Sequence, residues 1–197
     1  MHSCGIIYGD LKAENILFDE EGIINLCDFN LSGTIKLLEK QIQGTTSYLA
    51  PEIIKEKPKT PKSDYWSLGI LIHLMFYKRH AFTGVNQPDT LNSIVNNDLP
   101  AEPKGRNASQ PLRQLICDLL VKDVNKRVGN SIKEFMDHPF FKDFNWEEDL
   151  SFPKKFFPKN QKQDISKEME LEITRNENYY KIHNLTYDAS RDPTKSN

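Results

Sequence analysis

The sequence has little cysteine, no long hydrophobic run and no excess of either charge. Its three cysteines, Cys4, Cys27 and Cys117, are odd in number and lack the spacing of metal ligands. This argues against a disulfide framework or a zinc site, and we expect reduced thiols in a cytoplasmic or nuclear protein. The longest apolar stretch, residues 68–77, is interrupted by His73 and is too short to span a bilayer, so no membrane span is predicted.

Charge and the N-terminal residues exclude further classes of protein. The formal net charge is −2 and no basic stripe occurs, which argues against a nucleic-acid partner. No basic region followed by an apolar core opens the chain, so no signal peptide is predicted. A length of 197 residues, 38% of them hydrophobic and 27% charged, suits one soluble domain or one lobe of a two-lobed enzyme.

The pattern of apolar residues predicts a mainly helical fold with one small β-hairpin. Apolar strands at 16–18 and 23–27 flank an acidic turn that ends in Gly22. Residues 31–50 lack periodicity and are predicted to be a loop, and 55–62, rich in Lys and Pro, an exposed connection. Helices are expected at 51–55, from a cap at Ser63 or Asp64 to 77, and at 89–97, 112–121 and 131–138.

Two segments differ in composition. The helix that ends at Tyr77 is apolar nearly all round, which places it in the middle of a domain. From about residue 149 the chain turns to Lys, Glu, Asn and Asp with few aliphatics. We therefore expect one domain over 1–148 and a tail over 149–197 that packs on its surface or is partly disordered.

The residues best suited to catalysis and metal binding lie in the polar loop before the hairpin and directly after the hairpin. The loop holds a carboxylate (Asp10), a lysine (Lys12) and an amide (Asn15), and the second strand delivers another carboxylate (Asp28). This is the grouping needed to orient a hydroxyl and to hold two magnesium ions on a triphosphate. Each residue alone also fits an ordinary polar loop, so the interpretation depends on the joint pattern.

That joint pattern, D-L-K-x-E-N at 10–15 and D-F at 28–29, resembles the catalytic loop and metal-binding motif of a protein kinase. The resemblance implies ATP and Mg²⁺ as cofactors and a protein as substrate. It also implies that Asp10 orients the substrate hydroxyl, that Lys12 neutralises charge on the transferred group, and that the metal ligands are Asn15 and Asp28. The implied cofactor-binding residues are Lys12, Glu14, Asn15, Leu17 and Asp28.

Later segments resemble other parts of the same family. Residues 44–52 are similar to the end of an activation segment, in which Thr45 would bond the catalytic aspartate and lysine. The resemblance implies a buried ion pair between Glu52 and Arg127. It also implies that Asp64, at the start of the apolar helix, braces the backbone of the catalytic loop.

The resemblance narrows to the AGC group of serine/threonine kinases and covers about residues 1–160. Tyr8 stands where most kinases have histidine, as is typical of that group. Residues 126–129, 138–141 and 156–159 are similar to the end of the group's large lobe and its C-terminal tail.

The sequence departs from the family pattern in four places. The small lobe, with its glycine-rich loop and strand lysine, has no counterpart in this chain. Gly9 replaces an arginine that in the family grips a phosphate, and Gln41 stands at the usual phosphothreonine, so we expect activity without that phosphorylation. Asn30 replaces a glycine, which asparagine's tolerance of positive φ permits. Leu74 replaces an acid that reads arginine in substrates, which predicts a weakened basic preference.

Together these features predict the mainly helical large lobe of an AGC-like kinase, which transfers the ATP γ-phosphoryl group to serine or threonine. One alternative is a truncation that catalyses nothing alone. Another is an inactive kinase-derived module that docks proteins through residues 70–120. A third and remoter one is a helical domain unrelated to kinases.

Overall fold

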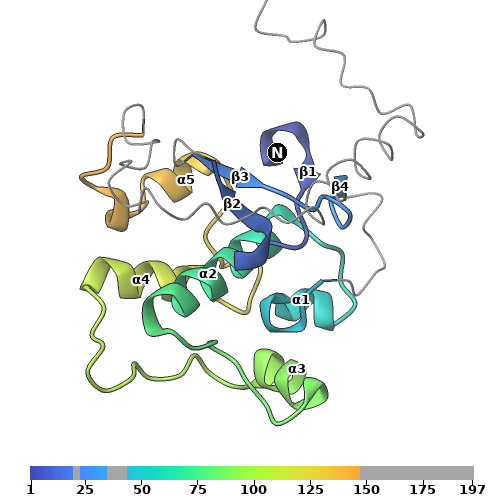
Figure 1. Ribbon diagram of the computed structural model, residues 1–197, viewed down its shortest axis with the longest axis vertical. Helices are drawn as coiled ribbons and strands as arrows, with labels where there is room; N and C mark the ends of the chain where they lie inside the picture. The colour runs from blue at the N-terminus through green and yellow to red at the C-terminus, as the bar shows by residue number, and fades with distance from the viewer. Residues whose placement is uncertain (20–22, 35–43, 147–197) are drawn as a thin grey trace, which may run out of the picture. The chain divides into compact units, whose positions relative to one another are not determined.

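The computed structural model describes residues 1–19, 23–34 and 44–146. Within these residues the paired strands precede the α-helices along the chain (Figure 1), and the predicted tail lies outside the described residues. In chain order the elements are η1 (His2–Cys4), β1 (Ile6–Ile7), η2 (Ala13–Asn15), β2 (Ile16–Phe18), β3 (Ile24–Leu26), β4 (Gly33–Thr34), η3 (Thr46–Tyr48), α1 (Pro51–Ile54), α2 (Pro61–Tyr77), α3 (Gln87–Asn96), α4 (Gln110–Leu119), α5 (Ile132–Met136) and η4 (Pro139–Phe141).

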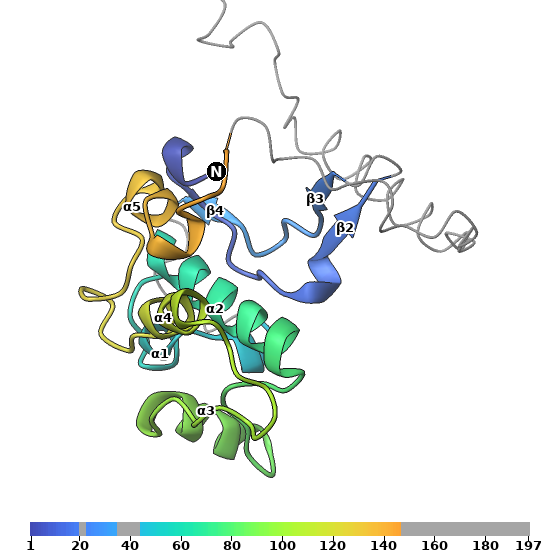
Figure 2. The same ribbon diagram turned by 90° about the vertical axis from the view of Figure 1, so that its left-hand side faces the viewer.

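Helix α2 lies at the centre of the helical part and packs against α4 (Figure 2). Trp66 and Ile70 are fully buried on α2, and the buried side chains of α4 are Leu115, Ile116 and Leu119. The helices approach closely at Gly69, where an added Cβ would stand 2.8 Å from the Cβ of Leu119. The prediction of a central apolar helix is confirmed.

The predicted start of α2 is wrong by several residues. Thr60 is the N-cap and Pro61 occupies the first turn, where its fixed φ and missing N–H cost nothing. Ser63 takes part as the third helical residue, accepting a bond from the backbone N of Thr60 at 3.2 Å. Asp64 lies inside the helix and is buried, because its carboxylate serves a tertiary contact described below.

Two other local predictions also need correction. The connection between α1 and α2 was expected to be exposed; residues 55–58 are exposed, but Lys59 is only 3% exposed. Residues 31–50 were expected to be a loop, but they contain β4 and η3. Strand β4 pairs antiparallel with β1, and this register places Ile7 opposite Gly33. The strand is therefore stabilised by a partner distant in sequence, which the periodicity of residues 31–50 does not reveal.

The remaining helices follow the predicted pattern with shifted ends. Side chains of Asn86, Ser109 and Ser131 accept backbone N–H groups at the N-termini of α3, α4 and α5. Helices α3 and α4 begin before their predicted starts, and each has a proline in its first turn. No helix within residues 1–19, 23–34 and 44–146 is both long enough and apolar enough to cross a membrane.

The expected ion pair between Glu52 and Arg127 is present and buried. Nη1 and Nη2 of Arg127 reach the two carboxylate oxygens of Glu52 at 2.7 and 2.8 Å, and the arginine is 0% exposed. Arg127 also donates to the carbonyls of Val121 and Lys62, and Ser63 donates to Glu52 at 3.0 Å. The charges are thus compensated, and the pair ties α1 to the segment before α5.

The β2–β3 hairpin projects away from the α2–α4 pair (Figure 2). Its antiparallel register matches Ile16 with Leu26 and Phe18 with Ile24. One more bond, from the backbone N of Cys27 to the carbonyl of Asn15 at 3.0 Å, closes the hairpin at its open end. The hairpin therefore joins the end of the polar loop directly to Asp28.

Candidate active site

Asp10 is the centre of a hydrogen-bonded cluster. Its Oδ1 accepts the backbone N–H of Thr45 at 3.1 Å and the Thr45 hydroxyl at 3.2 Å. Its Oδ2 accepts Nζ of Lys12 at 2.7 Å and Nδ2 of Asn15 at 3.2 Å. Lys12 also donates to the Thr45 hydroxyl at 3.1 Å, so the structure brings together residues from the polar loop and residue 45.

These contacts fix the charge of Asp10 and Lys12. Burial alone would raise the pKa of Asp10, but the hydrogen bonds from Lys12 and Thr45 outweigh it and hold that pKa below its ordinary value. The hydrogen bond to Asp10 raises the pKa of Lys12, with additional attraction from Asp28 and Glu14. Near neutral pH the site therefore holds a carboxylate beside an ammonium.

Asp64 sets the backbone just before Asp10. Its carboxylate accepts the backbone N–H groups of Tyr8 and Gly9, each at 2.8 Å, and Nε2 of His2 lies 2.7 Å away. The bracing role implied for Asp64 is present in the structure. His2 was not predicted to contribute, and nothing in its sequence neighbourhood marks it, because its partner lies 62 positions away.

Asn15 and Asp28 supply the oxygens that could hold magnesium. Nδ2 of Asn15 donates to the carbonyl of Asp10 at 2.9 Å, and no bond among the described residues uses its Oδ1. Asp28 is exposed, and its Oδ1 accepts the backbone N of Asn30 at 3.3 Å. Amide and carboxylate oxygens suit Mg²⁺, which keeps waters and phosphate oxygens as further ligands. The described residues contain no group of three or more His, Cys, Asp or Glu placed to hold a metal without such help.

The turn at Asp28 differs from the expectation based on Asn30. The left-handed conformation falls on Asp28 itself, with φ 57°, and Asn30 is absent from the positive-φ positions. Asn30 therefore does not need the tolerance of positive φ on which the expectation depended. Tyr8 supports the turn, since its hydroxyl donates to the carbonyl of Cys27 and its ring meets Phe29 edge-on at 5.4 Å.

The other predicted cofactor-binding residues flank this cluster. Glu14 is exposed on η2, and Leu17 is half-buried on β2. Their nucleotide contacts stay predictions. The predicted activation-segment residue Gln41 lies outside the described residues.

Gly9 is required by the backbone at its position. Its φ is 85°, and a Cβ added there would stand 2.5 Å from the carbonyl oxygen of Leu31. An arginine at this position would need a different path of the loop. The same added Cβ would lie 3.3 Å from Nζ of Lys59, a residue that the sequence pattern did not single out.

Known proteins resemble this chain over most of its length. A model of the protein kinase domain matches residues 1–141. The chain belongs to the protein kinase family. It is 37% identical over 166 residues to serine/threonine-protein kinase sgk-1 of Caenorhabditis elegans, covering 81% of this chain and 35% of the relative. It is 34% identical over 154 residues to cAMP-dependent protein kinase type 3 of Saccharomyces cerevisiae, covering 77% of this chain and 38% of the relative.

These relatives confirm the AGC-like resemblance and the kinase-like, mainly helical fold class. Phototropin-2 of Oryza sativa is also similar, at 34% identity over 178 residues. The chain spans well under half the length of the curated relatives it matches. The predicted boundary after residue 148 lies just beyond the last described residue and stays a prediction.

Proposed function

We propose that the protein transfers the γ-phosphoryl group of ATP to serine or threonine hydroxyls of protein substrates. The observation that carries this proposal is the bonding of Asp10 to Lys12, Asn15 and Thr45, beside the open oxygens of Asn15 and Asp28. Protein kinases as a family use ATP and Mg²⁺. Magnesium, when bound, would offset the negative charge of the phosphates.

Each polar residue of the site has a separate proposed role in the transfer. Asp10 has both carboxylate oxygens positioned by donors, so it can orient a substrate hydroxyl and accept its proton. Lys12 carries a positive charge next to Asp10 and can stabilise charge that develops on the transferred group. The oxygens of Asn15 and Asp28 would hold the metal. Thr45 fixes Asp10 and Lys12 relative to each other.

The test is phosphoryl transfer by the full-length protein purified from cells, with radiolabelled ATP and a serine/threonine peptide library. Asp10→Asn and Asp28→Asn should each lower kcat by about 10²–10⁴-fold, because one removes the proton acceptor and the other a metal ligand. Asp98→Asn, at an exposed acid outside the site, is the matched control and should keep wild-type activity. Undiminished transfer by Asp10→Asn would refute the proposal.

Docking through residues 70–120 stays a prediction. Met75 and Val85, 62% and 98% exposed, are single apolar side chains of the kind found on any soluble surface. A partner retained equally by wild type and Asp10→Asn, together with absent transfer in the wild type, would favour the inactive docking module instead.

A further inference from the structure

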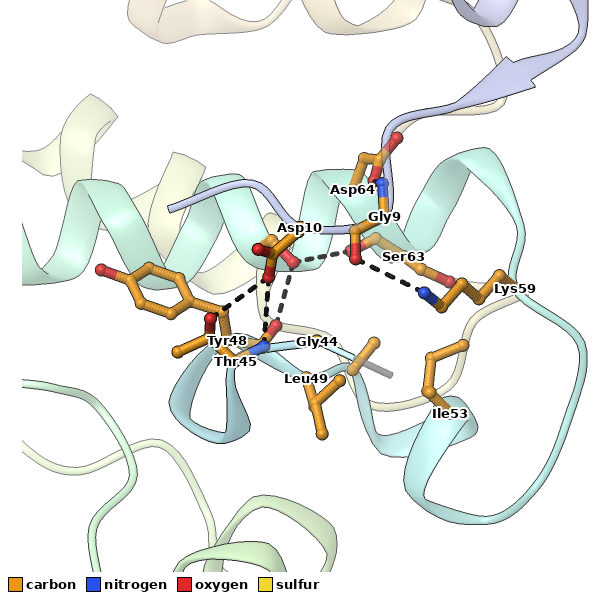
Figure 3. Close-up of a pocket in the computed structure, with 12 residues that line it drawn as sticks. Gly9, Asp10, Gly44, Thr45, Tyr48, Leu49, Ile53, Lys59, Ser63 and Asp64 are labelled. Carbon is orange, nitrogen blue, oxygen red and sulfur yellow. Dashed lines mark hydrogen bonds between the residues drawn. The ribbon is translucent and has the colours of Figure 1, made fainter. Parts of the chain in front are cut away.

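Lys59 is a buried cation that the proposed reaction does not yet use. It lies on the connection between α1 and α2 and is 3% exposed. Figure 3 shows its ammonium pointing at the backbone carbonyl of Gly9, the residue before Asp10, at 3.5 Å. A side chain distant in sequence therefore reaches the backbone that carries Asp10.

This placement costs folding energy. An ammonium has three donors, and among the described residues Lys59 makes only this one long hydrogen bond. Burial lowers the pKa of Lys59, and attraction to Asp64 and Asp10 offsets part of that change. A charge buried with so few partners destabilises a fold, and an apolar side chain of similar length would avoid that cost. Stability alone therefore does not explain a lysine at this position.

The surroundings indicate what the charge does. The carboxylates of Asp10 and Asp64 are 8% and 6% exposed, and a nearby cation reduces the penalty for burying both. The backbone of Gly9 is held at both polar groups, its N–H by Asp64 at 2.8 Å and its carbonyl by Lys59. Because Asp10 follows directly, the orientation of the Gly9 carbonyl sets where the Asp10 side chain begins.

The space around Lys59 is too small for a ligand larger than a water molecule. Residue 9 must lack a side chain, since a Cβ would crowd the carbonyl of Leu31 and the ammonium itself. The adjoining cavity, walled by Asp10, Thr45 and Lys59 among others, has a volume of about 20 Å³. That is room for one water and too little for a phosphate group.

We infer that Lys59 is a positioning residue that holds the Gly9 carbonyl, and through it Asp10, in the geometry used for phosphoryl transfer. The inference rests on the proposed function for its catalytic consequence. The absence of a side chain at Gly9 leaves the space that the ammonium group of Lys59 occupies.

The test compares Lys59→Met with Lys57→Met in the full-length protein. Lys57 is an exposed lysine on the same connection and serves as the matched control. For Lys59→Met we expect kcat to fall about tenfold, with the KM values for ATP and peptide changed less than about twofold, because Asp10 acts in the chemical step. Its Tm should change little, since the loss of a poorly compensated buried charge is offset by the loss of its attraction to Asp10 and Asp64. Lys57→Met should match the wild type in all of these.

A second variant and a second measurement keep the test decisive. Lys59→Gln retains a donor for the Gly9 carbonyl but no charge, so its kcat should fall less than that of Lys59→Met. It also replaces Lys59→Met if the methionine variant fails to fold. Amide hydrogen exchange of residues 8–15 should accelerate in Lys59→Met and not in Lys57→Met. An unchanged kcat or an unchanged loop exchange in Lys59→Met would each overturn the inference.

The exchange measurement also separates this inference from the proposed function. If the wild type transfers no phosphate to any substrate, the proposed function fails, and exchange at residues 8–15 alone decides whether Lys59 holds the loop. If the wild type is active and Lys59→Met is not slowed, the proposed function stands and the inference fails.

Discussion

Asp10 is 8% exposed and accepts bonds from Lys12, Asn15 and Thr45, whereas Asp28 is exposed and accepts one backbone bond among the described residues. The contacts of Asp10 come from the polar loop and from residue 45, and helix α2 braces the preceding backbone. Asp28 depends on the local β2–β3 hairpin. The fold thus surrounds Asp10, the proposed proton acceptor, with donors and leaves Asp28, the proposed metal ligand, exposed.

The largest expected effect comes from breaking the buried pair between Glu52 and Arg127. Arg127→Met should lower the free energy of unfolding by about 3–5 kcal/mol, because it leaves the buried Glu52 carboxylate without its partner. Urea denaturation measures this loss. Hydrogen exchange should show faster opening around residues 45–54, while the hairpin amides at 16–26 change least.

Arg113→Met is the matched control for that variant. Arg113 also pairs with a glutamate, Glu102 at 2.6 Å, but the arginine side chain is 54% exposed. Water replaces such a partner readily, so a much smaller loss is expected. Equal losses for Arg113→Met and Arg127→Met would contradict the role of burial.

A smaller effect on stability should distinguish the two carboxylates directly. Asp10→Asn leaves Lys12 without its buried counter-charge and should cost about 1–3 kcal/mol of unfolding free energy. Asp28→Asn, at an exposed position, should change it by less than about 0.5 kcal/mol. Both variants should lose phosphoryl transfer, so thermal unfolding would separate them where activity does not. A larger cost for Asp28→Asn would reverse the comparison.

The smallest effect is a pH dependence. The pKa of Asp10 is lower in the folded protein than its ordinary value. The stability that this carboxylate contributes is therefore present above the unfolded-state pKa and lost as pH falls through the folded-state pKa. Between about pH 5 and pH 2, wild type should lose more stability than Asp10→Asn does. Parallel curves for the two proteins in denaturant titrations would show that Asp10 contributes no such dependence.

Residues with strong local or family signals were predictable from the sequence. The hairpin, the central apolar helix and the Glu52–Arg127 pair were expected and are present. The start of α2 was misplaced because Ser63 and Asp64 are good capping residues by type, although tertiary contacts use them. Pro61 after Thr60 was the signal that could have corrected it.

Lys59 and His2 could not be found in this way. A Lys- and Pro-rich segment usually lies in solvent, and nothing in residues 55–62 shows which lysine turns inward. Both side chains contact partners that lie 50 or more positions away in the sequence. A single sequence carries no record of such pairings unless a motif includes them.

The bonds from Asp64 to the amides of Tyr8 and Gly9 have a consequence for the order of folding. They join residues 55 and 56 positions apart, so the chain must close a long loop before the polar loop acquires its working shape. Helix α2 gains most of its bonds locally and can form first, presenting Asp64 in its first turn. We therefore expect the polar loop to gain its bonds to Asp64 late in folding and to lose them early in unfolding.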